Sequence, residues 1–70
     1  MARKKYNLVG IDGNAFSVMG YVRSAMKAEG FSREEIEAYT KDAMSSDYNY
    51  LLAVSCDMVD ACNAKAKGNK

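Results

Sequence analysis

The 70-residue sequence contains no histidine, no tryptophan and no proline, and only two cysteines. Without histidine, a serine or cysteine nucleophile lacks its usual general base, and no imidazole is present to bind zinc. The longest unbroken aliphatic run covers residues 51–54, whereas a membrane span needs about 20 apolar residues. We therefore expect a protein that is not an enzyme, does not enter a membrane, and has no catalytic, cofactor-binding or metal-binding residues.

The two cysteines, Cys56 and Cys62, fall within one expected helix. Six residues at a rise of ~1.5 Å each separate their Cα atoms by ~9 Å, which is beyond disulfide reach. A sequence without disulfides is typical of a reducing compartment, so the expected location is the cytoplasm. We expect both thiols to act as small apolar side chains.

The composition is that of a soluble globular protein, with 49% hydrophobic and 27% charged residues. This length provides one core and not two. The sequence therefore predicts a flexible basic arm over residues 1–5, a single helical domain over 6–64 and a disordered basic tail over 65–70.

Charge is distributed unevenly along the chain, although the net charge is only +1. Six of the ten basic residues lie in the arm and the tail, so segment 6–64 has four basic residues against nine acidic ones, a net charge of −5. Basic ends can contact nucleic-acid phosphates. However, Asp57 and Asp60 lie in the last expected helix, which gains no basic residue before Lys65. Nucleic-acid binding is therefore the disfavoured alternative, and solubilising ends are the preferred interpretation.

The clearest local signal is a boundary between two helices near residue 30. Gly30 can end a helix with a positive φ. Ser32 and Glu35 have the spacing of a capping box, and Phe31 and Ile36 have that of a hydrophobic staple. One helix therefore ends here and another begins.

Apolar residues recur at helical spacing near residues 14–29, 32–45 and 47–64. The sequence therefore predicts an all-α fold, a small three-helix bundle with a short extended N-terminal segment. The residues expected on its buried faces are Ala15, Val18, Met19, Val22, Ala25, Met26, Ile36, Tyr39, Ala43, Met44, Tyr48, Leu51, Leu52, Ser55, Met58, Val59 and Cys62.

Residues 6–11 are prone to form a strand but have no obvious strand partner in the chain. We expect Leu8, Val9 and Ile11 to pack on the bundle, and the protein to be mostly monomeric. The alternative is a strand that pairs with another chain.

Two features at the first helix have competing interpretations. Gly13 and Asn14 precede its N-terminus, where backbone N–H groups can bind an anion, but a turn with a helix cap at Asn14 is favoured. Gly20 is the centre of a stripe of small residues, with Ser17, Ser24 and Ala28. We expect that stripe to pack against another helix of the same chain.

A partner surface is expected on the last helix. Positions 48 and 50 point about 200° apart on a helix, so both cannot be buried, and Tyr50 is the one expected to be exposed. Exposed tyrosine is enriched at interfaces. The candidate surface is Tyr50 with the acidic residues Asp57 and Asp60.

A pattern of residues resembles a group of small uncharacterised proteins of bacteria and their phages or mobile elements. The pattern consists of residues 12–16 (DGNAF), 19–20 (MG), and 47–52, with Asp-Tyr followed by Leu-Leu. That group has no assigned activity, so the resemblance implies only a free-standing bacterial cytosolic protein. The expected function is a non-enzymatic module that binds an unidentified protein partner.

Overall fold

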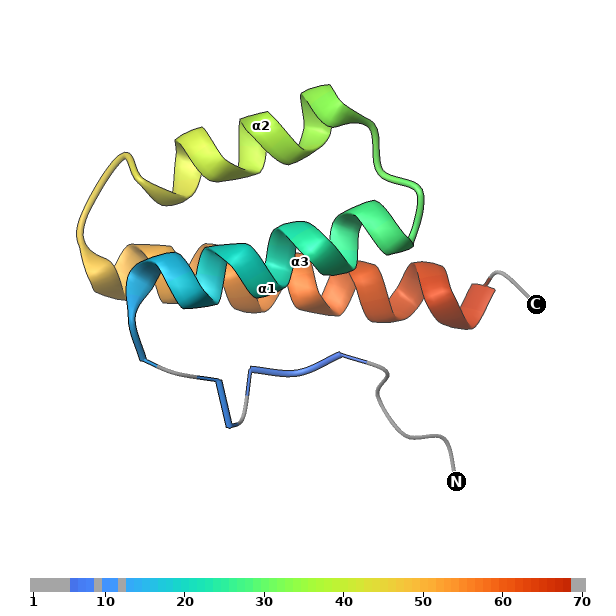
Figure 1. Cartoon of the computed structure of the whole chain (residues 1–70), viewed down its shortest axis with the longest axis horizontal. Coiled ribbons are helices and arrows are strands. Elements are labelled where there is room, and N and C mark those ends of the chain that lie inside the picture. Colours follow the sequence, from blue (N-terminus) through green and yellow to red (C-terminus); the bar gives the residue numbers. More distant parts are fainter. Residues whose placement is uncertain (1–5, 9, 12, 69–70) are drawn as a thin grey trace.

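The computed structural model describes residues 6–8, 10–11 and 13–68. Three helices follow one another, α1 (Ala15–Ala28), α2 (Arg33–Ala43) and α3 (Tyr48–Gly68), and the described residues form no strand. Successive helices run in opposite directions, so α1 begins, α2 ends and α3 begins at the same end of the molecule (Figure 1). The prediction of an all-α three-helix bundle is confirmed.

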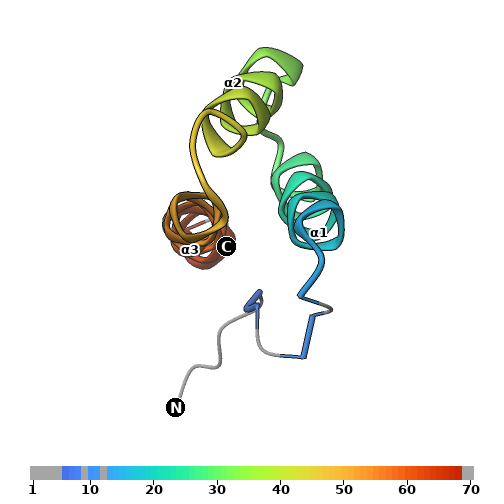
Figure 2. The ribbon, with the colours of Figure 1, turned by 90° about the vertical axis from the view of Figure 1, so that its left-hand side faces the viewer.

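The helices lie at the corners of a triangle when viewed along their axes (Figure 2). The N-terminal segment lies beside α1 and α3, on the side away from α2. No helix in the described part of the chain has both the length and the apolar character to cross a membrane. The buried core comprises Val18, Met19, Val22, Ala25, Met26, Tyr39, Ala43, Leu51, Val59 and Cys62.

The junction between α1 and α2 has the predicted geometry. The Ser32 Oγ accepts the Glu35 N–H at 3.1 Å, and the Glu35 carboxylate accepts the Ser32 N–H at 2.8 Å. The hydrogen bond from the Ser32 N–H, together with the nearby Ser32 hydroxyl, holds the pKa of the Glu35 carboxyl below its usual value. Gly30 has φ +85°, and the Phe31 N–H reaches back to the Met26 carbonyl, so the chain reverses within a few residues.

The N-terminal segment is attached to α3 through the side chain of Asn63. Its Oδ1 accepts the Tyr6 N–H at 2.7 Å, and its Nδ2 donates to the Tyr6 carbonyl at 2.8 Å. Leu8 and Ile11 are half-buried against the core, as predicted. Val9 lies outside the described residues. The described part of this segment is therefore an irregular arm packed on the bundle, with a turn at which the Ile11 N–H donates to the Leu8 carbonyl at 3.2 Å and Gly10 has φ +86°.

The same segment also contacts α1. The Tyr6 hydroxyl donates to Glu29, which ends α1 and is buried. The Tyr6 and Tyr21 rings meet edge to face with their centroids 6.5 Å apart. Tyr6 therefore contacts both α1 and α3, and it helps to hold these two helices together.

Three expectations about particular residues were wrong. Met44 was expected to be buried but is exposed, because α2 ends at Ala43 and the chain turns before the helical stripe continues. Tyr48 was expected to be buried but is 41% exposed at the first residue of α3, whereas Leu51 in the same turn is buried. The stripe of small residues is open at its centre, since a Cβ at Gly20 would meet nothing within 4 Å, and Ser24 and Ala28 are exposed.

The predicted end of the domain at residue 64 was also too early. α3 continues to Gly68, so residues 65–68 are helical and not part of a disordered tail. The Lys65 ammonium lies 4.5 Å from the centre of the Phe31 ring, and Ala66 is half-buried. These contacts, with good helix formers, extend the helix. Residues 1–5 and 69–70 lie outside the described residues.

Candidate functional site

Four large apolar side chains are exposed at one end of the bundle. They come from the start of α1, the end of α2 and the start of α3, which lie together (Figure 1). We call this group the apolar end. Its members are Phe16 (74% exposed), Met44 (57%), Tyr48 (41%) and Tyr50 (38%).

Phe16 and Tyr48 are held on the two helices that begin at this end. The Phe16 N–H donates to the Asn14 side chain at 2.8 Å, which caps α1, and the Phe16 side chain lies off the buried stripe of that helix. The Tyr48 hydroxyl donates to the Gly13 carbonyl. This bond ties the first turn of α3 to the residues that enter α1.

Tyr50 joins α3 to α2. Its hydroxyl donates to Asp42 at 2.8 Å, and its N–H donates to the Asp47 side chain at 2.9 Å. The hydrogen bond to the Asp42 carboxylate raises the pKa of the Tyr50 phenol. The ring is therefore partly exposed while its polar tip is already bonded within the chain, which leaves a fixed, largely apolar surface.

The predicted partner surface is only partly brought together. Tyr50 is exposed, as expected, but it groups with Met44 at the apolar end. Asp57 and Asp60 are exposed seven and ten residues further along α3, which at ~1.5 Å per residue is ~10 and ~15 Å away along the axis. The two carboxylates therefore flank the middle of α3.

Phe16, Met44 and Tyr48 are the members of the apolar end that the sequence interpretation missed. One signal was available, because Phe16 lies off the apolar stripe of α1 that Ala15 and Val18 define. Met44 gave no such signal, since its spacing from Tyr39 and Ala43 fits the buried face of a longer helix.

The residues proposed as an anion site have local partners. The Asn14 Oδ1 is bonded to the Phe16 N–H, and the Gly13 carbonyl accepts the Tyr48 hydroxyl. The helix cap at Asn14, which was the favoured interpretation, is therefore confirmed.

The two cysteines differ in their surroundings. Cys56 is exposed, whereas Cys62 is buried, and burial raises the pKa of the Cys62 thiol. Among residues 6–8, 10–11 and 13–68, no three His, Cys, Asp or Glu side chains are grouped so that they could hold a metal ion.

No family model, curated protein or solved structure matches this chain. The resemblance to small proteins of bacteria and their phages therefore stays a prediction. The case for a function depends on the surfaces of the molecule itself.

Proposed function

We propose that the protein is a small interaction module that binds another protein through its apolar end. One observation carries the proposal, namely that the exposed large apolar residues of the described chain come from three helices and gather at one end of the bundle. A grouped apolar surface on a small protein is typical of an interaction site.

The residue types at this end suit protein recognition. Tyrosine, phenylalanine and methionine are enriched at the centres of interfaces, and methionine adapts its shape to a partner. Hydrogen bonds from Tyr48 to Gly13 and from Tyr50 to Asp42 hold the aromatic rings before any partner arrives. Such preorganisation lowers the entropy that binding costs.

The test uses the protein as bait in an extract of the cells in which it occurs, and cross-linking captures the proteins that bind to it. The double variant Phe16→Ser with Met44→Ser removes apolar surface without touching the core. The matched control is Ala61→Ser with Ala64→Ser, two exposed positions in the second half of α3. Circular dichroism confirms that both variants fold.

The proposal requires one or more proteins to be captured by the wild type and the control, and lost with the double variant, whether or not nuclease is present. Equal capture by both variants would reject the apolar end as the binding surface. Loss of all capture on nuclease treatment would favour the alternative, an accessory nucleic-acid binder that uses its basic ends. Binding through phosphates would also weaken steeply with salt, whereas an apolar contact would not.

A further inference from the structure

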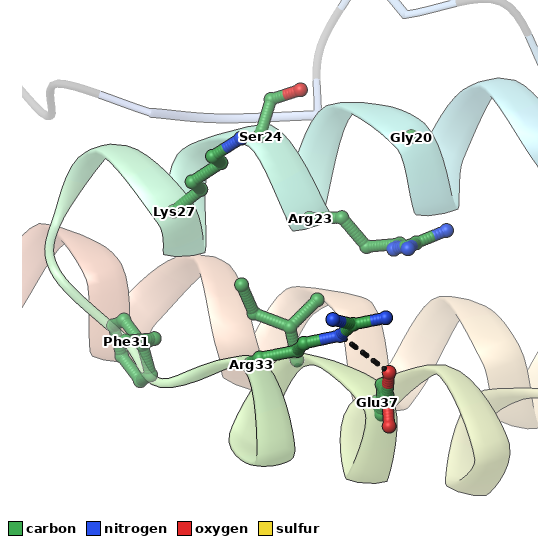
Figure 3. A pocket seen from close by; sticks show the side chains of 8 residues that line it. Gly20, Arg23, Ser24, Lys27, Phe31, Arg33 and Glu37 are labelled. Atoms are coloured by element: carbon green, nitrogen blue, oxygen red, sulfur yellow. Dashed lines mark hydrogen bonds and ion pairs between the residues drawn. The ribbon is translucent and has the colours of Figure 1, made fainter.

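A second surface lies near the turn between α1 and α2, away from the apolar end. It is a groove of about 660 Å³ between the second half of α1 and the first half of α2, and α3 lies behind it (Figure 3). Its lining residues are Gly20, Arg23, Ser24, Lys27, Phe31, Arg33, Ile36 and Glu37.

The groove carries an excess of positive charge. Three of its lining residues are basic and one is acidic. The Arg33 Nε lies 3.1 Å from the Glu37 carboxylate, and both side chains are more than half exposed, so this ion pair is weak and another carboxylate can compete for Arg33. The side chains of Arg23 and Arg33 come from different helices and lie on facing sides of the groove (Figure 3).

The floor of the groove is apolar. Phe31 and Ile36 are half-buried there, and both pack against the core. At Gly20 the space is open, since a Cβ would meet nothing within 4 Å. The groove therefore combines an apolar floor with a basic rim.

We propose that this groove binds an acidic peptide segment of another protein, with an apolar side chain on the floor and flanking carboxylates on Arg23 and Arg33. Guanidinium groups match carboxylates in paired, charge-assisted hydrogen bonds, and Lys27 adds a further positive charge. This site is additional to the apolar end.

Charge complementarity favours a short peptide over a nucleic acid. Glu34 and Glu35 are exposed in the first turn of α2, next to Arg33. The positive charge is therefore confined to a short stretch of surface, which a few carboxylates of a peptide can match, whereas a continuous phosphate backbone extends beyond it into acidic surroundings. The volume of the groove, about 660 Å³, lies within the range of about 300–1,000 Å³ that is usual for ligand pockets.

The test selects peptides from a random display library on the immobilised full-length protein. The expected result is enrichment of sequences in which Asp or Glu flanks an apolar residue. Fluorescence anisotropy with a labelled synthetic copy of an enriched peptide then measures affinity. The double variant Arg23→Gln with Arg33→Gln should weaken binding at least about tenfold, since two charge-assisted contacts are lost.

Three variants separate the groove from the rest of the molecule. Gly20→Gln fills the open space without changing charge and should also weaken binding. Lys41→Gln removes an exposed positive charge near the end of α2 and should leave affinity unchanged. The apolar-end variant, Phe16→Ser with Met44→Ser, should bind the peptide normally, so this proposal and the proposed function fail separately.

The proposal is overturned if no sequence is enriched above the bare support, if enriched sequences lack acidic residues, or if the groove variants bind as well as the wild type. Displacement of the peptide by a short oligonucleotide at equal or lower concentration would reassign the groove to nucleic acid. Displacement by inorganic phosphate alone at similar concentration would reduce it to a general anion site.

Discussion

Tyr39 of α2 and Ser55 of α3 share a buried hydrogen bond, with 2.6 Å between their hydroxyl oxygens. Both residues are at most 3% exposed, so neither hydroxyl can turn to bulk water. A buried polar group that loses its partner costs more than the bond itself contributes. This pair therefore couples the packing of α2 to that of α3.

Removing either hydroxyl should have unequal effects. Ser55→Ala strands the Tyr39 phenol in the core and should cost about 1–3 kcal/mol of stability. Tyr39→Phe should cost less, about 0.5–1.5 kcal/mol, because the Ser55 hydroxyl can instead bond a carbonyl in the preceding helical turn. Urea denaturation of both single variants and the double variant measures the coupling. The double variant should be more stable than Ser55→Ala alone, because it contains no phenol without a partner, and simple addition of the two costs would contradict the coupling.

The titration of Tyr39 should make the free energy of unfolding depend on pH in alkaline solution. Burial raises the pKa of Tyr39 above its usual 10.0. As the pH rises through that value, the unfolded chain loses the phenolic proton while the folded chain keeps it. Stability is therefore fully present below this pH and declines above it. Tyr50, whose pKa is raised by Asp42, adds to the decline.

Denaturation measured between about pH 8 and 11 checks this dependence. The wild type should lose stability across the upper half of the range, and Tyr39→Phe should lose less because one titrating group is gone. An equally steep decline in Tyr39→Phe would show that this phenol does not contribute. Tyr50→Phe is the matched variant at the surface, and it should likewise reduce the decline in stability because its raised pKa also contributes to it.

The cap of α2 provides a third prediction. Ser32→Ala removes the acceptor of the Glu35 N–H and should lower stability by about 0.5–2 kcal/mol. Ser32→Asp keeps an acceptor in place and should stay close to the wild type. Thermal denaturation, followed by the circular dichroism signal of the helices, compares the melting temperatures of the wild type and the two variants. An unchanged melting temperature for Ser32→Ala would mean that this cap adds nothing to the bundle.

The junction at Ser32 was predictable because its signal is local. Ser32 and Glu35 are three residues apart and bond each other, so the sequence contains both partners of the motif. The helical stripes were predictable for the same reason, since a spacing of three or four residues defines a face. Fold class follows from these short-range patterns.

The candidate sites were less predictable because they depend on where helices end and on what lies across from them. Met44 is exposed because α2 ends one residue earlier. Arg23 and Arg33 face each other only after the chain reverses at Gly30. No local spacing encodes these two relationships. The continuation of α3 to Gly68 has a local part, the helix formers Lys65 and Ala66, and a long-range part, the contact of Lys65 with Phe31.

The attachment of the N-terminal segment provides a fourth prediction. Asn63→Ala removes both hydrogen bonds to the Tyr6 backbone and should lower stability on the order of 1–3 kcal/mol. Amide hydrogen exchange over residues 6–11 should become faster, while α1 and α2 keep their protection. Asn49→Ala, at an exposed position near the start of α3, is the control. Unchanged exchange in the Asn63 variant would show that the remaining contacts, the apolar packing of Leu8 and Ile11 and the contacts of Tyr6 with Glu29 and Tyr21, hold the segment without Asn63.

Two glycines of similar exposure should respond in opposite directions to alanine. Gly20 lies within α1, and an added Cβ would meet nothing within 4 Å. Gly20→Ala should therefore raise stability by about 0.5–1 kcal/mol, because alanine loses less backbone freedom on folding. At Gly30, φ is +85° and the nearest atom to an added Cβ is the Lys65 Nζ at 3.9 Å, which is ordinary contact. Gly30→Ala should lower stability by about 1–2 kcal/mol through backbone strain alone.

Chemical denaturation of the two glycine variants beside the wild type measures both effects. If Gly20→Ala is destabilising, then another element contacts this face of α1, and the groove between α1 and α2 is not open at that position. If Gly30→Ala is neutral, the turn can leave the left-handed region without loss. The expected pair of opposite shifts would show that Gly30 is required by the reversal of the chain. It would also show that the backbone freedom of Gly20 in the unfolded chain lowers the stability of the protein. A glycine at this position is then an advantage only if a ligand approaches α1 closely in the groove.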